Sequence, residues 1–315
     1  MTGKMSLGSR AVLIIALVVL AFLPAVLERH SIDLMVFAAL YSIAGLGVGL
    51  LLGQCGIVNL AQSFFYGIGA YASAYGTTAL GWPPVVGILA GMAIAGLAAL
   101  SIGWPILRLT GFFLALATLA VGMIGTILFF EWDWLTGGTL GIGGLPPLSI
   151  AGFAFDSPAR FYYLVWGLVL IVLLAALNLT AGRPGLAMRA VRDATLAAEG
   201  LGVDIHGLRV QVFVIGAMLG ALAGSLFAHY VTYVSVESFT VQRSIVFLLI
   251  PVIAGARTVW GVLPGALFVT LVPEWLSGFG DIHQMLFGML LVAVVTLLPE
   301  GLTGLPARLQ RRFAR

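Results

Sequence analysis

FYYLVWGLVLIVLLAAL, residues 161–177, contains no charged side chain. Runs of the same kind lie at residues 11–27 and 285–298. A helix needs about 20 mostly apolar residues to cross the hydrocarbon core of a bilayer, and it satisfies its backbone polar groups internally. A membrane β-barrel would instead show alternating segments of about 10 residues. The sequence therefore predicts an all-α polytopic membrane protein.

The composition of the 315 residues excludes a soluble domain. Hydrophobic residues make up 61% and charged residues 9%, whereas a soluble domain carries about 25% charged residues. The single cysteine, Cys55, leaves no internal disulfide. Arg10 precedes the first apolar run as in a signal peptide, but Glu28 and Arg29 follow it instead of a small-residue cleavage site, so we expect an uncleaved first helix.

We predict about ten transmembrane or re-entrant helices in a single domain that covers residues 1–315. The breaks near 53–60 and 256–262 are so short that a kinked or re-entrant helix competes there with two separate spans. The expected spans are 11–28, 33–52, 59–79, 84–105, 111–131, 161–181, 211–231, 243–256, 261–277 and 283–299.

Basic residues flank these spans unevenly, and an excess of Lys and Arg marks cytoplasmic loops. With the N-terminus in the cytoplasm, ten spans return the C-terminus to the same side. Only Arg29, Arg160 and Arg243 are then expected outside, and the placement explains the basic composition without a nucleic-acid partner. The basic residues expected inside are Lys4, Arg10, Arg108, Arg183, Arg189, Arg192, Arg209, Arg257, Arg308, Arg311, Arg312 and Arg315.

Two loops are long. The outer loop, about 131–160, is rich in glycine and carries Trp132 and Trp134, which suit the headgroup interface. The inner loop, about 182–209, is the most polar stretch of the chain.

The stretch 53–71, GQCGIVNLAQSFFYGIGAY, interrupts the apolar pattern. Buried amides are costly in lipid unless they are paired or face water. One interpretation is a discontinuous helix of the kind from which transporters build sites at the membrane midplane. The other is a short cytoplasmic turn with its amides in water. A glycine-rich join at 253–266 is a weaker echo of this stretch. The interrupting residues are Gly53, Gln54, Gly56, Asn59, Gln62 and Ser63.

The inner loop contains an amphipathic helical pattern over residues 186–201. Such a helix either lies on the membrane surface with its arginines near anionic lipid or docks into a groove on a cytoplasmic partner. The apolar face consists of Ala187, Val191, Ala194, Ala198 and Leu201, and the polar face of Arg189, Arg192, Thr195 and Glu199.

The stretch 53–71 and the inner loop resemble the permeases of branched-chain amino acid ABC transporters. The family pattern in the loop is approximately G-R-x-x-x-A-x-R-x-x-x-x-A-A-E-x-x-G, and Leu186 stands here where the family usually has arginine. The resemblance covers about residues 33–300. The matching loop residues are Gly185, Ala190, Arg192, Ala197, Ala198, Glu199 and Gly202.

The resemblance implies a subunit of the bacterial inner membrane that pairs with a second related permease. It implies cytoplasmic subunits that bind and hydrolyse ATP, so that this chain carries no cofactor, and a periplasmic substrate-binding protein. The coupling helix would be formed by Arg183, Arg189, Arg192, Ala197, Ala198, Glu199 and Gly202. The translocation path would pass Gln54, Asn59, Gln62, Ser63 and Phe64.

Other functions remain open at this point. Relatives of such permeases also take up urea, short amides and small organic acids. An ion-driven secondary transporter usually has ionisable residues within its spans, and here Glu274 is the nearest approach to one. We expect no enzyme, since the sequence has no phosphate-binding loop and no metal-ligand spacing among His30, His206, His229 and His283.

Overall fold

The structure is a computed structural model that describes residues 23–24, 28–150, 152–278, 280–298 and 301–304. The first expected span, 11–28, therefore lies almost wholly outside the described residues. Among these described residues, five helices are long and apolar enough to cross a membrane. They are α2 (Arg29–Gly49, continued by the π-helix η1, Leu50–Gln54), α4 (Pro84–Ile106), α5 (Gly111–Glu131), α7 (Pro158–Ala181) and α10 (Ile205–Val231).

Shorter helices complete the bundle. They are α3 (Gln62–Thr78), α11 (Val241–Ala254), α12 (Val262–Ser277) and α13 (His283–Leu297), followed by the 3₁₀ turn η5 (Leu302–Gly304). A further 3₁₀ turn, η4 (Gly280–Ile282), precedes α13. The helical architecture predicted from the apolar runs is confirmed, and α4 and α5 end within a residue of their expected limits.

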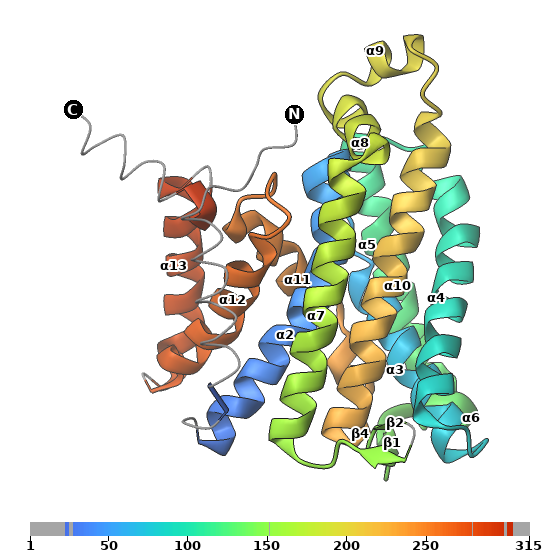
Figure 1. The fold of residues 1–315 in the computed structure, drawn as a ribbon, viewed down its shortest axis with the longest axis vertical. Helices are drawn as coiled ribbons and strands as arrows, with labels where there is room; N and C mark the ends of the chain where they lie inside the picture. The colour runs from blue at the N-terminus through green and yellow to red at the C-terminus, as the bar shows by residue number, and fades with distance from the viewer. Residues whose placement is uncertain (1–22, 25–27, 151, 279, 299–300, 305–315) are drawn as a thin grey trace.

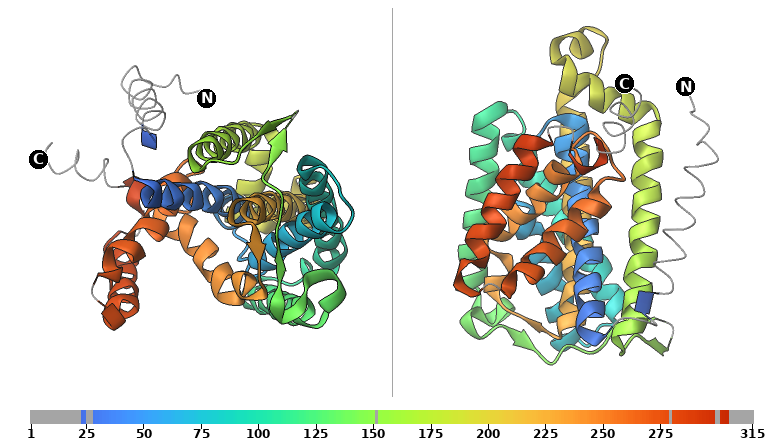
Figure 2. Two further views of the ribbon diagram at one scale, coloured as in Figure 1. Left: turned by 90° about the horizontal axis from the view of Figure 1, so that it is seen from below. Right: turned by 90° about the vertical axis from the view of Figure 1, so that its left-hand side faces the viewer.

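The two ends of the bundle differ. At one end, here called the α9 end, α8 (Arg183–Asp193) and α9 (Thr195–Gly200) project beyond the other helices (Figures 1 and 2). At the other, here called the strand end, the segment between α5 and α7 folds over the bundle. It contains α6 (Asp133–Thr136), η2 (Gly138–Leu140), β1 (Ile142–Gly143), β2 (Ser149–Ile150) and β3 (Phe153–Ala154).

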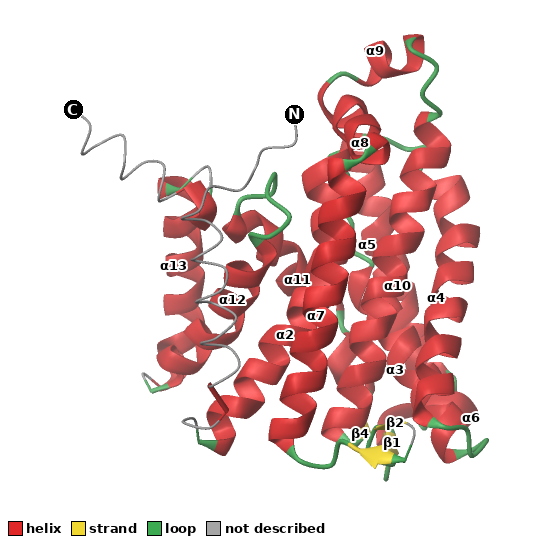
Figure 3. Ribbon diagram, in the orientation of Figure 1, coloured by secondary structure: helices red, strands yellow, loops and turns green. Residues whose placement is uncertain are grey.

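The strands at the strand end are two residues long (Figure 3). β1 pairs antiparallel with β4 (Tyr233–Val234), which follows α10, and β2 pairs antiparallel with β3. The β1–β4 pair ties the segment after α5 to the segment after α10, and the 3₁₀ turn η3 (Val236–Phe239) then leads back into the bundle.

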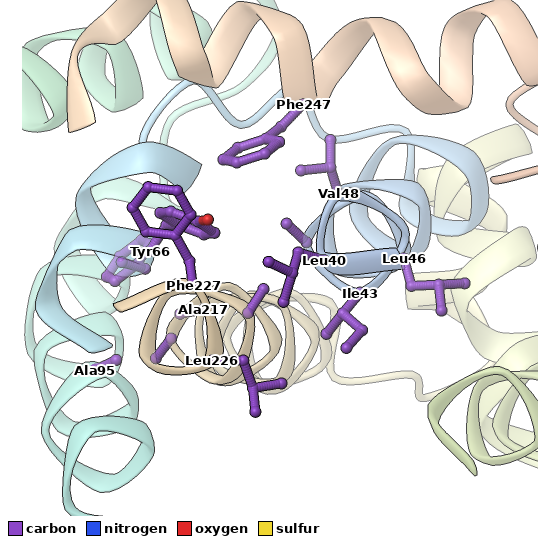
Figure 4. Close-up of a cluster of buried hydrophobic side chains, with 14 of the residues drawn as sticks. Leu40, Ile43, Leu46, Val48, Tyr66, Ala95, Ala217, Leu226, Phe227 and Phe247 are labelled. Atoms are coloured by element: carbon purple, nitrogen blue, oxygen red, sulfur yellow. The ribbon is translucent and has the colours of Figure 1, made fainter. Parts of the chain in front are cut away.

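Helix α10 forms the centre of the bundle and packs against α2, α3 and α4. Glycines permit the closest approach. A Cβ on Gly224 would lie 1.8 Å from the carbonyl oxygen of Tyr66, and one on Gly69 would lie 2.1 Å from that of Ala221. Small residues at such crossings allow membrane helices to pack backbone to backbone. Leu40, Tyr66 and Phe247 fill the adjoining space between α2, α3 and α11 (Figure 4).

Helices α3 and α11 share a feature that the expected spans did not contain: both begin in the middle of the bundle. α2 reaches the α9 end, the chain turns back through residues 55–61, and α3 then continues to the strand end. α10 reaches the strand end, the chain turns back through residues 232–240, and α11 continues to the α9 end. The two units run in opposite directions. The segment that corresponds to residues 53–71 in the second half of the bundle is therefore the start of α11, and not the join at 253–266.

Candidate functional site

The break between α2 and α3 is enforced by glycine. Gly56 has a φ of +70°, a region that L-residues rarely adopt. A Cβ on Gly53 would lie 1.8 Å from the carbonyl oxygen of Ala256. Just before the break, the α-helix widens into the π-helix η1, which is frequent at functional sites. The predicted chain break is confirmed. The chain turns back at this break, so α2 and α3 run in opposite directions and do not form one discontinuous helix.

The amides after the break are buried and hydrogen-bonded within the chain. The Asn59 side chain accepts from the backbone N–H of Ala61 at 2.9 Å and donates to the side-chain oxygen Oε1 of Gln62 at 3.2 Å. The Gln62 amide nitrogen donates to the carbonyl oxygens of Gly216 at 3.0 Å and Ala44 at 3.3 Å. The alternative expectation of a turn between two helices is thus correct for the path of the chain, but its amides are not in water, because Asn59 and Gln62 are fully buried in the single chain.

The starts of α3 and α11 are joined by two serines. Ser63 Oγ lies 2.6 Å from Ser244 Oγ, and the backbone N–H of Ser63 donates to Ser244 Oγ at 2.8 Å. This pair of serines, here called the joint, lies near the middle of the bundle between the α9 end and the strand end. Close to it, the backbone N–H of Leu60 donates to Thr118 Oγ1, and Thr118 is well inside α5.

The other two residues expected along the path lie apart from this cluster. Phe64 turns toward α5, where it packs against Phe129 with ring centroids 5.7 Å apart. Gln54 lies at the α9 end, where its amide donates to the carbonyl oxygen of Arg257 at 3.2 Å. The structure thus brings Asn59, Gln62 and Ser63 together and places Phe64 and Gln54 to either side.

Arg243 also lies at mid-depth, and the expectation that it lies outside is wrong. Its guanidinium donates to the Tyr41 hydroxyl and lies 5.7 Å from the centre of that ring. Tyr41 is near the middle of the helical segment Arg29–Gln54. The error arose because residues 232–240 look like an outer loop by composition, while in the structure they return into the bundle. An arginine two residues into an apolar run was the signal in the sequence.

The inner loop forms two helices, so the expected single helix over 186–201 is wrong. The break falls at Ala194, whose φ and ψ of −153° and 70° are not helical. Arg189 donates to the Thr180 carbonyl oxygen at 2.9 Å, and Arg192 donates to the Gly53 carbonyl oxygen. The neighbouring Arg192 guanidinium also lowers the pKa of the Asp193 carboxyl through a hydrogen bond.

The residues of this loop divide by exposure. Ala198 is buried, and the arginines that anchor α8, Arg189 and Arg192, are half-buried. Leu196 and Leu201 are 84% and 85% exposed. The remaining predicted coupling residues, Arg183, Ala197, Glu199 and Gly202, are also exposed. The tip formed by α9 therefore carries apolar and charged side chains that are exposed in the described part of the chain.

The comparison with protein families decides the class of the chain. A family described as "Branched-chain amino acid transport system / permease component" matches residues 31–295. The chain belongs to this family. It is thus a multi-pass membrane permease and not an enzyme, and ATP hydrolysis belongs to the ATP-binding partners in such systems. Among the described residues, no group of three or more His, Cys, Asp or Glu side chains is arranged to hold a metal ion.

Individual relatives agree with this assignment. The chain is 31% identical to the high-affinity branched-chain amino acid transport system permease protein LivM of Escherichia coli K12, over 92% of this chain and 74% of the relative. It is 24% identical to the probable LivM of Methanocaldococcus jannaschii, over 86% and 94%. It is 25% identical to LivH of E. coli K12, over 84% and 92%. No solved structure matches the chain.

Proposed function

We propose that this chain forms half of the translocation path of an ABC importer for branched-chain or related small amino acids, in the plasma membrane of a bacterium. A second related permease would form the other half. The similarity to both LivM and LivH, two proteins of one E. coli strain, supports a pair of related but different chains. ATP-binding subunits would drive the cycle from the cytoplasm, and a periplasmic binding protein would deliver the substrate.

The α9 end would face the cytoplasm. Arg108, Arg183, Arg209 and Arg257 lie at this end, together with the arginines of α8, whereas Arg29 and Arg160 lie at the strand end. An excess of arginine in short loops marks the cytoplasmic side. On this orientation, the segment between α5 and α7 forms the outer loop, with Trp132 and Trp134 at the interface.

The exposed tip of α9 is the observation that carries the proposed docking. Leu196 and Leu201 are bulky, apolar and almost fully exposed on an element that projects from the bundle. Exposed apolar side chains on a projecting element suit a protein groove better than water. Glu199 and Gly202, two of the predicted coupling residues, are also exposed and lie beside them in the sequence.

The anchors of α8 would transmit the movement. Arg192 holds the carbonyl oxygen of Gly53, and Gly56 lies directly against the Arg192 side chain, where a Cβ would meet Cγ at 2.9 Å. A displacement of α8 by the ATP-binding subunit would therefore pull on the break between α2 and α3. In this proposal Asn59, Gln62 and Ser63 support that break beside the path, while Gln54 and Phe64 lie at its two sides.

The test uses a pair of leucines with matched exposure. Leu196→Glu places a charge at the tip of α9, and Leu140→Glu does the same at the strand end, where Leu140 is 83% exposed. Leu196→Glu should reduce co-purification of the ATP-binding subunit and ATP-dependent uptake, and Leu140→Glu should leave this co-purification unchanged. Equal behaviour of the two variants would remove the docking assignment.

Reconstitution of the complex into proteoliposomes also distinguishes the alternative functions. Uptake in proteoliposomes without any ATP-binding subunit would indicate an ion-driven transporter. ATP-dependent uptake of urea or a short amide in preference to leucine would retain the importer but replace its substrate class.

A further inference from the structure

Arg243 is a permanent positive charge in the middle of the bundle. Its hydrogen-bond partner Tyr41 lies about 18–20 Å along the helix axis from each end of the segment Arg29–Gln54, at 1.5 Å per residue. The next residue, Ser244, is joined to Ser63 at the start of α3. A guanidinium stays protonated in proteins, so this charge persists at a depth where charged side chains are rare and generally functional.

No carboxylate of the described residues neutralises this charge. The ion pairs in the described part of the chain are His30–Glu274, Arg160–Asp156 and Arg192–Asp193, all near the ends of the bundle. Asp33 on α2 and Glu274 on α12 both lie toward the strand end, where Asp33 accepts from Tyr230 and Glu274 contacts His30. Arg243 therefore lacks a counter-ion from its own described surroundings.

The position is open rather than sealed in the core. Arg243 is half-buried, while the adjacent Gln242 and Ile245 on α11 are exposed on the surface of the single chain. A surface of this kind at mid-depth has to face either lipid, a partner chain or the translocation path. Arginine side chains in membranes face a bundle interior or a water-filled cavity in nearly all cases, so exposure to lipid is disfavoured.

Further donors point to the same region. Within the described part of the chain, the buried Tyr66 hydroxyl has no hydrogen-bond partner. The rings of Tyr66 and Tyr41 both pack against Phe247 of α11, with centroids 5.3 and 5.4 Å from that ring. The first turn of α11 has no side-chain cap at Thr240. Uncapped N–H groups at a helix start favour an anion, and discontinuous helices in transporters direct such starts toward anionic groups of the substrate.

We propose that Arg243, oriented by Tyr41 at the start of α11, binds the carboxylate of the substrate as it passes the middle of the membrane. A carboxylate accepts two parallel N–H bonds from a guanidinium and supplies the counter-ion that the described chain lacks. The inference rests on the proposed function and extends it. It selects amino acids and other carboxylates over urea and neutral amides, which would leave the charge unpaired.

The test compares Arg243→Gln with Arg243→Lys in proteoliposomes that contain the complete importer and its binding protein loaded with leucine. Arg243→Gln should lower ATP-dependent leucine uptake by at least about tenfold, the loss expected when a hydrogen-bonded charge pair is removed. Arg243→Lys keeps the charge and should retain clearly more uptake than Arg243→Gln. Gln211→Ala, at an exposed position near the start of α10, should transport like the unchanged chain.

A second variant guards against misassembly. Tyr41→Phe removes only the hydroxyl that orients the guanidinium, and it should lower uptake less than Arg243→Gln while the complex assembles and melts as before. Unchanged uptake by Arg243→Gln would overturn the inference. Loss of the second permease from purified Arg243→Gln would also overturn it, since the counter-ion would then belong to that subunit. Failure of the unchanged complex to import leucine would instead remove the proposed function.

Discussion

The starts of α3 and α11 are two versions of one arrangement, and they differ in how their polar groups are satisfied. At the start of α3, the side-chain oxygen and nitrogen of both Asn59 and Gln62 are hydrogen-bonded inside the chain. At the start of α11, Arg243 contacts a tyrosine and no carboxylate of the described residues. A fully paired polar group is expected to stabilise a fold, whereas a charge without a counter-ion lowers stability unless a ligand or partner completes it. We therefore assign a structural role to the start of α3 and a binding role to the start of α11.

The largest effect is expected where α3, the helix whose start has the structural role, packs against α10. Gly224→Val should prevent folding, because even a Cβ at this position would lie 1.8 Å from the Tyr66 carbonyl oxygen and neither backbone can yield. The yield of monodisperse protein in detergent measures the effect. Gly167→Val is the control, since no atom lies within 4 Å of a Cβ on Gly167. Normal yield of Gly224→Val would show that the start of α3 is not held by this crossing.

The second largest effect is expected when a glutamine at the start of α3 or α11 is replaced by leucine and the free energy of unfolding is measured. Gln62→Leu should lower the free energy of unfolding by roughly 2 kcal/mol, because it removes three buried side-chain hydrogen bonds and leaves Asn59 without its acceptor. Gln242→Leu should change it by less than about 0.5 kcal/mol, since Gln242 is exposed. Unfolding in mixed micelles measures both. A larger loss for Gln242→Leu would reverse the assignment of support to α3.

Much of the fold follows from hydropathy alone, and the exceptions have physical causes. The limits of α4 and α5 are predictable because both helices are apolar from one membrane surface to the other. The depth of Arg243 is not, because hydropathy registers where apolar residues occur and not whether a polar linker such as 232–240 turns back into the bundle. The β1–β4 pair that anchors this linker joins residues that are distant in the sequence.

The same limit applies to the candidate coupling loop. Its periodicity runs unbroken through Ala194, where neither glycine nor proline signals an end. The helix nevertheless ends there. Its arginines Arg189 and Arg192 donate to the carbonyl oxygens of Thr180 and Gly53 and so hold α8 against the bundle. Tertiary hydrogen bonds of this kind override a local pattern. The docking partner and the orientation of the loop stay predictions, and the pair of variants at Leu196 and Leu140 tests them.

The smallest effect concerns the joint that connects the two starts. Ser244 Oγ accepts the backbone N–H of Ser63 and shares a hydrogen bond with Ser63 Oγ, whereas Ser63 Oγ has only the second of these contacts. Ser244→Ala should therefore lower the free energy of unfolding by about 1 kcal/mol, and Ser63→Ala by less. Because the hydroxyl–hydroxyl bond is common to both, the double variant should be no less stable than Ser244→Ala alone. Additive losses in this double-mutant cycle would mean that the two helix starts are held independently, and the contrast between a supporting start and a binding start would then lose its physical link.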